Sequence, residues 1–236
     1  MFGITTIPGL VALFTIVGAI LSFYIYDYLG IKSKRVKVAE AKDSFDKIVG
    51  NLSSADNTTK LAAAIMLRRF LDGQNKRKRT FLFQESVNVI SSMLKVLPTG
   101  IFQKTLADGL AHAGNLARVD LQKTNLQDVY LGRKDETVIT VTDTDFYLAD
   151  LSYALLEHVS GKAIFYRAIL FCTQIKNSDL TGSSFREADL TRVNFKNVIL
   201  KDADFTDALN VPLRIKEKLK EGKYQDDAPV TAGHDL

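Results

Sequence analysis

The chain has 236 residues, enough for one large domain or two small ones. Hydrophobic residues make up 46% and charged residues 25%, which are ordinary values for a globular protein, but the apolar residues are concentrated at the N-terminus. The formal net charge is +4, and the basic excess lies before Pro98, where 14 basic side chains face 7 acidic ones. A single cysteine, Cys172, excludes an intrachain disulfide, and His112, His158 and His234 form no cluster at metal-ligand spacing. The composition predicts a reducing compartment and neither a metal nor another cofactor.

The first 26 residues carry no charged side chain. Residues 7–26 would span about 30 Å as a helix at about 1.5 Å per residue, which matches the hydrocarbon core of a bilayer. No Lys or Arg precedes this run and it ends in aromatic residues, so an uncleaved transmembrane anchor over residues 1–30 is favoured over a secretory signal or a buried core helix. The run is followed by aromatic and then basic residues, namely Phe23, Tyr24, Tyr26, Tyr28, Lys32, Lys34, Arg35 and Lys37. By the positive-inside rule we expect a single-pass protein of a bacterial inner membrane, with its N-terminus outside and its bulk cytoplasmic.

Small residues recur within this run at a spacing of four. Thr15 pairs with Ala19, and Gly18 pairs with Ser22. Such small-xxx-small patterns let transmembrane helices approach closely, so they predict a packing face and a homo-oligomer. The alternative is that small residues are simply common in such helices.

Residues 31–113 show apolar positions at helical spacing and predict several short amphipathic helices, with breaks at 51–57, at 73–79 and at Pro98. Thr99 is placed to cap a last helix over residues 100–113. We expect this helical domain to cap the array that follows it. The basic run Lys76, Arg77, Lys78 and Arg79 has no interleaved aromatic residues and predicts a solvated loop rather than a nucleic-acid site. Alternatively, together with Lys32, Lys34 and Arg35, it lies against anionic lipid.

A period of five residues dominates the second half of the chain. Large apolar residues occupy nine successive sites, which are Phe165, Leu170, Ile175, Leu180, Phe185, Leu190, Phe195, Leu200 and Phe205. Two residues before each site lies a short side chain, and Asp or Asn often falls between the two. A helix needs a period near 3.6 and a strand needs 2, so neither keeps these sites on one face. A chain that turns a corner every five residues does, and four corners close one square coil. The large and the small residue then point inward, and coils stack about 4.8 Å apart.

This pattern resembles the pentapeptide-repeat family, whose unit is approximately A(D/N)LXX. The run SDLTG-SSFRE-ADLTR-VNFKN-VILKD-ADFTD, residues 178–207, carries the resemblance. The resemblance implies a mainly β solenoid, a right-handed quadrilateral β-helix over residues 114–209, and no enzymatic activity of its own.

The repeat starts before residue 165, in a different phase. Leu116, Leu121, Leu126 and Leu131 keep the spacing, and Phe146, Leu151 and Leu156 continue it. The phase then slips by one residue, so we expect a short coil or bulge near residues 158–161. Residues 133–136 break the pattern and are expected to loop out. About 18 units predict four to five coils, whose open ends need caps. Residues 210–224 are expected to form a short capping helix, and residues 225–236 a disordered tail.

Residues that resemble catalytic groups have simpler explanations in this repeat. Asp145 and Asp204 occupy the Asp/Asn position, where turn hydrogen bonding accounts for them. Ser183 and Ser184 have no histidine at a defined spacing, and the chain has no phosphate-binding glycine loop. The sequence therefore predicts binding and no enzyme.

Several outward positions around one level of the array are apolar or aromatic where polar residues are expected. They are Tyr147, Tyr153, Ile164, Tyr166, Ile169, Phe171 and Cys172. Tyr147 and Tyr166 are expected to stack one coil apart, with Phe171 around the corner. Contiguous exposed apolar surface marks contact sites, so Tyr147, Tyr166, Ile169 and Phe171 form the candidate protein-binding band. Alternatively, the phase slip turns some of them inward, or the loop at Glu136 covers them.

Three functions fit these features. The first is a membrane-tethered scaffold that binds another protein, or itself, at the cytoplasmic face. The second is an effector that oligomerises through its transmembrane helix and disturbs the membrane, for example in phage defence. The third follows from family members that resemble a DNA duplex and bind type II topoisomerases. Those members need a strongly acidic surface, whereas this chain from Pro98 onward has 17 basic and 20 acidic side chains.

Overall fold

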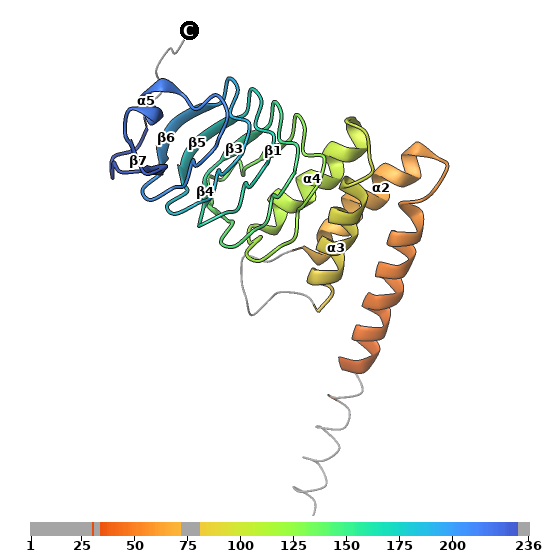
Figure 1. Cartoon of the computed structure of the whole chain (residues 1–236). Coiled ribbons are helices and arrows are strands. Elements are labelled where there is room, and N and C mark those ends of the chain that lie inside the picture. The colour runs from red at the N-terminus through yellow and green to blue at the C-terminus, as the bar shows by residue number, and fades with distance from the viewer. Residues whose placement is uncertain (1–29, 31–33, 72–80, 231–236) are drawn as a thin grey trace, which may run out of the picture. The chain divides into compact units, whose positions relative to one another are not determined.

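The computed structural model describes residue 30 and residues 34–71 and 81–230, which divide into one unit within residues 1–47 and another within 48–236 (Figure 1). In the first unit, residues 34–47 are helical, and Lys34 and Arg35 are exposed. No helix of the described residues is long and apolar enough to cross a membrane. The predicted membrane-spanning run, with Thr15, Gly18, Ala19 and Ser22, lies outside the described residues, as do Lys32, Lys76, Arg77, Lys78 and Arg79.

The second unit begins with short helices, as the sequence predicts. They are α2 (Asn57–Leu67), the 3-10 turn η1 (Arg68–Phe70), α3 (Phe83–Leu94) and α4 (Ile101–Ala113). Asp56 begins α2, because its carboxylate accepts hydrogen bonds from the backbone N–H groups of Thr58 and Thr59. Helix α4 ends at Gly114, whose φ of 66° is the left-handed conformation that closes a helix. Its N-cap is Gly100, not Thr99 as expected, since the Thr99 hydroxyl bonds the Gln127 side chain instead.

These helices cap the solenoid through buried polar contacts. The Ser91 hydroxyl of α3 donates to the Asp120 carbonyl at 2.6 Å. The Gln103 amide of α4 donates to the carbonyls of Asn125 at 2.9 Å and Gln127 at 3.2 Å. These carbonyls belong to the first coil, which has no preceding coil to pair with, so the helices supply the missing donors. The predicted capping role is confirmed.

The solenoid has four faces, each a ladder of parallel β pairs between successive coils (Figure 1). The strands are β1 (Tyr130–Leu131), β2 (Ile139–Thr140), β3 (Leu155–Glu157), β4 (Val159–Ser160), β5 (Gln174–Asp179) and β6 (Asn194–Ile199). The first face joins residues 115, 140, 160, 179 and 199, and the second joins 120, 145, 164, 184 and 204. The third face joins 125, 150, 169, 189 and 209, and the fourth joins 130, 155, 174 and 194. A four-sided coil with a corner every five residues is therefore observed, and its hand stays a prediction.

Both irregularities predicted in the repeat are present. On the first face, Thr140 pairs with Ser160 and Asp179 with Ile199, which are turns of 20 residues, whereas Ser160 and Asp179 are 19 apart. The missing residue falls between Ser160 and Ile164, at Gly161. Asn115 pairs with Thr140, so the turn before these takes 25 residues, and the loop at 133–137 accounts for the extra five.

The core consists of the predicted inward residues. The large and short residues of each repeat are buried, and four phenylalanines stack along the second face. Phe146, Phe165, Phe185 and Phe205 stand 4.9 Å apart between ring centroids, with interplanar angles of 5°, 8° and 6°. This spacing equals that of adjacent β-strands, so each coil brings one ring into register with the next.

Most corners contain a non-glycine residue with positive φ, which the sequence analysis did not foresee. Arg118, Lys123 and Asp128 have φ of 62°, 57° and 56°, and equivalent residues follow in later coils. The Asp or Asn of the repeat stabilises these turns, because its side-chain oxygen accepts the N–H two residues on. Asp145 and Asp204 do so at 2.9 Å each, as expected.

The C-terminal cap differs from the single helix expected over residues 210–224. Only Leu213–Lys216 forms helix (α5), and β7 (Leu219–Lys220) and β8 (Lys223–Tyr224) pair as an antiparallel hairpin. The predicted disordered tail also differs over residues 225–230, because Val230 is buried and pairs with Val198. Strand pairing satisfies the open edge of the last coil, which a helix cannot do. Residues 231–236 lie outside the described part.

Candidate interaction surfaces

Two tyrosines form a stack on the second face. The rings of Tyr147 and Tyr166 have centroids 5.4 Å apart at an interplanar angle of 19°. The Arg167 guanidinium lies 5.1 Å from the Tyr166 ring centroid. Glu187 joins both residues, since it accepts a hydrogen bond from the Tyr166 hydroxyl at 3.0 Å and one from Arg167 Nε at 2.6 Å. The predicted stacking one coil apart is confirmed, and the rings are half-buried in a fixed arrangement.

The charges around this stack are mutually satisfied. Hydrogen bonds from Arg167 and then from Tyr166 hold the pKa of the Glu187 carboxyl below its usual range. The same contact raises the pKa of the Tyr166 phenol, because the Glu187 carboxylate accepts its proton in a hydrogen bond. At neutral pH the stack is therefore a neutral aromatic pair bordered by one closed ion pair.

The third face continues the apolar surface around the corner. Tyr153 and Phe171 meet edge to face with centroids 5.4 Å apart. Tyr153 is 60% exposed and Ile169 is 41% exposed. Ile169 pairs with Asp150 on one side and Asp189 on the other. We call the residues Tyr147, Tyr153, Tyr166, Ile169 and Phe171 the aromatic band.

The two alternatives raised for the band do not hold in the structure. None of its residues is turned into the core, because all are exposed or half-exposed. The loop with Glu136 packs elsewhere, since Arg133 at its start bonds the His112 carbonyl of α4. The sequence analysis missed two flanking leucines, Leu148 and Leu209, which are 41% and 58% exposed. Their outward positions in the repeat were the signal that could have identified them.

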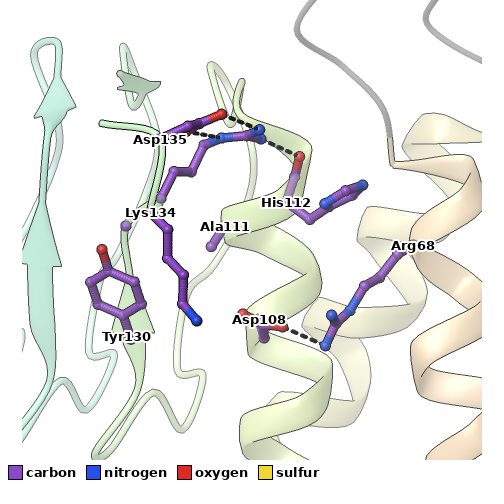
Figure 2. A pocket seen from close by; sticks show the side chains of 9 residues that line it. Arg68, Asp108, Ala111, His112, Tyr130, Lys134 and Asp135 are labelled. Atoms are coloured by element: carbon purple, nitrogen blue, oxygen red, sulfur yellow. Dashed lines mark hydrogen bonds and ion pairs between the residues drawn. The ribbon is translucent and has the colours of Figure 1, made fainter. Parts of the chain in front are cut away.

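A second site is an open pocket of about 360 Å³ between α4 and the first coil, shown in Figure 2. It is lined by Arg68, Asp108, Ala111, His112, Tyr130, Gly132, Arg133, Lys134 and Asp135. Arg68 forms an ion pair with Asp108, and Arg133 forms one with Asp135. The sequence analysis did not predict this pocket, and its only trace in the sequence is the break in the repeat at residues 133–136.

Residues weighed as catalytic groups have structural roles. Ser183 is fully buried, and its hydroxyl accepts the Ala163 N–H at 3.0 Å. Within residues 34–71 and 81–230, no three His, Cys, Asp or Glu side chains come together as a possible metal site. The described residues thus offer contact surfaces and one pocket as candidate sites.

Comparison with known proteins agrees with the repeat. Residues 168–207 match the family model for pentapeptide repeats in eight copies. No curated protein sequence matches the chain at a significant level.

Solved structures that resemble the chain are also built of such repeats. One is HetL, a pentapeptide repeat protein involved in heterocyst differentiation regulation from the cyanobacterium Nostoc sp. strain PCC 7120, with 23% identity over 40% of this chain and 46% of that one and a TM-score of 0.24. Another, from the cyanobacterium Cyanothece 51142, has 20% identity over 41% of this chain and 80% of that one and a TM-score of 0.22. QnrB1, a plasmid-mediated fluoroquinolone resistance protein, has 12% identity over 40% of this chain and 55% of that one and a TM-score of 0.24.

The chain thus spans about half the length of two of these structures, and its identification rests on the repeat itself. The five-residue register, the inward Leu and Phe columns and the family match at residues 168–207 agree with one another. Over its solenoid, the chain is a pentapeptide-repeat protein.

Proposed function

We propose that this chain is a non-catalytic scaffold that binds another protein through the aromatic band. The observation that carries the proposal is the exposed cluster of Tyr153, Ile169 and Phe171 on the third face. Apolar residues at outward positions gain nothing for the coil, whose inward columns already form a complete core. Contiguous exposed apolar surface of this kind marks contact sites in soluble domains.

The band also has the composition and rigidity of a binding surface. Aromatic residues are enriched at protein interfaces and dominate their energetics. Ladder hydrogen bonds fix the backbone on both sides of the band, since Tyr153 N–H donates to the Phe171 carbonyl at 2.8 Å and Leu148 N–H donates to the Tyr166 carbonyl at 3.2 Å. A partner therefore meets a preorganised surface and loses little affinity to ordering it.

We further propose that residues 1–30 tether the scaffold to a membrane, with the solenoid on the cytoplasmic side. The support is in the sequence, where residues 1–26 carry no charge and Lys32, Lys34 and Arg35 follow. Extraction of native membranes with alkaline carbonate tests the tether. Retention of the full chain in the pellet is expected, and release into the supernatant would contradict it.

The binding function is tested by crosslinking in the native membrane. A photo-reactive amino acid replaces Tyr153 in one variant and Lys196, on the fourth face, in a matched control. We expect a specific crosslinked protein from position 153 only. The double variant Tyr153→Ser, Phe171→Ser then loses the partner in co-purification, while its circular dichroism spectrum and unfolding midpoint stay close to those of the parent chain. Equal crosslinking from both positions, or co-purification unchanged in the double variant, would refute the proposal.

The charge pattern of the second face does not favour DNA mimicry. Arg167 and Arg186 alternate there with Glu187 and Asp204, in ion pairs of 2.6 Å and 3.5 Å. A duplex mimic needs a continuous acidic surface, which a face of closed ion pairs does not offer. The membrane-disturbing function depends on residues 7–26, and growth arrest on overexpression, lost on changing Gly18 and Ser22, would support it.

A further inference from the structure

The loop at residues 133–137 is an addition to the coil that the fold does not need. Other turns of the first face close with 19 or 20 residues, whereas the turn from Asn115 to Thr140 takes 25. The loop is nevertheless held in place. Arg133 Nη1 donates to the His112 carbonyl at 3.0 Å, and Asp135 accepts from the Thr137 hydroxyl at 2.7 Å. An extra segment that is firmly anchored shapes the space beside it.

That space is the pocket between the loop, α4 and η1 (Figure 2). Tyr130 and Gly132 form the wall on the first coil, and Ala111 lies on α4. A side chain at position 132 would fill this wall, since a Cβ there would lie 2.6 Å from the Tyr130 ring. Its volume of about 360 Å³ falls in the range of small-molecule sites, roughly 300 to 1,000 Å³.

The charges that line the pocket leave one cation over. Of the Lys and Arg side chains, Arg68 pairs with Asp108 and Arg133 pairs with Asp135. Hydrogen bonds from Arg133 and then from Thr137 hold the pKa of the Asp135 carboxyl far below its usual range, so this carboxylate stays ionised and committed to the loop. Among the described residues, Lys134 forms no ion pair or hydrogen bond. Figure 2 shows its side chain extending into the pocket between Tyr130 and Asp108.

A second donor in the pocket wall also lacks a partner. Arg68 Nε is buried, and no described residue accepts a hydrogen bond from it. Buried donors in native proteins are nearly always satisfied by protein, water or ligand. An acceptor in this pocket would satisfy Arg68 and neutralise Lys134 at the same time.

We propose that this pocket binds a small organic anion, with its carboxylate or phosphate group on Lys134 and Arg68 and its apolar part against Tyr130 and Ala111. The flat ring of Tyr130 suits an apolar or aromatic ligand body, and the ammonium group of Lys134 supplies a point charge for either anionic group. This site is separate from the aromatic band, so it does not depend on the scaffold function.

Calorimetric titration of the full chain in detergent tests the proposal with four probes: acetate, inorganic phosphate, benzoate and phenyl phosphate. We expect saturable binding of benzoate or phenyl phosphate with a Kd of about 1 mM or tighter, and weaker binding of the two probes without a ring. The better of the two ring compounds identifies the anionic group. Added salt should weaken binding, because the ligand is held by charge at an open site.

Lys134→Met removes the charge and keeps the chain length, and should raise the Kd at least tenfold with no change in the unfolding midpoint. Lys123→Met, at an exposed position on the second face, is the matched control and should leave the Kd unchanged. The ligand should also protect Lys134, but not Lys123, from acetylation measured by mass spectrometry. Absence of saturable binding by all four probes, equal affinity in Lys134→Met, or equal loss in both variants would overturn the proposal.

Discussion

Gly161 lies directly against the backbone of Thr142 in the preceding coil. A Cβ on Gly161 would stand 2.6 Å from the Thr142 nitrogen and 2.4 Å from its hydroxyl oxygen, and the φ of Gly161 is 131°. Its N–H bonds the Asp179 carbonyl, as the N–H groups of Val141 and Leu180 bond the next coil at equivalent inward positions. Glycine therefore replaces a large core residue where the coil is one residue short, because only glycine fits both the conformation and the space.

Gly161→Ala should accordingly destabilise the solenoid. Both backbone strain, of order 1–3 kcal/mol, and the clash with Thr142 oppose the alanine, so we expect a loss of about 3 kcal/mol in the free energy of unfolding. Gly182→Ala is the matched control. Its φ of 68° resembles that of the other corners, and no atom would lie closer than 3.8 Å to its Cβ. Urea denaturation should show a loss of only about 1 kcal/mol there; losses of equal size would contradict the packing argument.

The phenylalanine stack of the second face should carry a large share of the stability. Phe185 contacts Phe165 and Phe205 at 4.9 Å and is fully buried, so Phe185→Ala should cost about 3–5 kcal/mol in the same assay. Phe185→Leu, which supplies the residue found in other inward columns, should cost less than about 1.5 kcal/mol. Phe81→Ala, at a site that is 52% exposed, should change stability little. A similar loss at Phe81 and Phe185 would argue against the stack.

The sequence predicts the solenoid well because one physical constraint repeats. Every five residues the same pair of positions must be inward, so Phe165 and Phe185 could be placed in the core from spacing alone. The phase slip was visible for the same reason. The left-handed corners were not foreseen, because residues such as Arg118 and Lys123 do not themselves favour positive φ, and the ladders on both sides impose it.

Features made by contacts distant in sequence were beyond prediction. The C-terminal hairpin depends on Val198 having an unpaired edge that Val230 can reach, and residues 210–224 alone show only an apolar spacing that also suits a helix. The pocket likewise needs Arg68, Asp108 and Lys134 to meet from three separate segments. The aromatic band could be named because its residues violate a polar position within the repeat itself.

The contact between helical cap and first coil should depend on Gln103. This side chain is buried and donates to the carbonyls of Asn125 and Gln127. Gln103→Leu keeps the volume but leaves both carbonyls unsatisfied, so we expect a loss of about 2–3 kcal/mol. Faster hydrogen exchange should appear in the first coil and not in the last. Gln122→Leu removes a half-buried amide that bonds Asp145 and should cost less than about 1 kcal/mol. Uniform exchange changes along the solenoid would contradict a local capping role.

Stability should fall in acid through the turn carboxylates of the repeat. Burial favours the neutral acid at Asp204, but hydrogen bonds from the Thr206 hydroxyl and N–H, with the charge of Arg186, outweigh it and lower the pKa of this carboxyl.

A group with a lowered folded-state pKa contributes stability above its unfolded pKa, about 3.9 for Asp, and loses it as pH falls through the folded value. Thr206→Val removes one donor to Asp204 and should narrow the gap between the two pKa values. The variant should therefore be less stable than the parent chain at pH 7, and the difference should shrink as pH falls below about 4. Thr58→Val, an exposed helix position outside the solenoid, provides the control. Urea denaturation from pH 7 to pH 2 measures the effect, and a Thr206→Val difference that stays constant with pH would show that the hydroxyl acts by packing and not through the charge of Asp204.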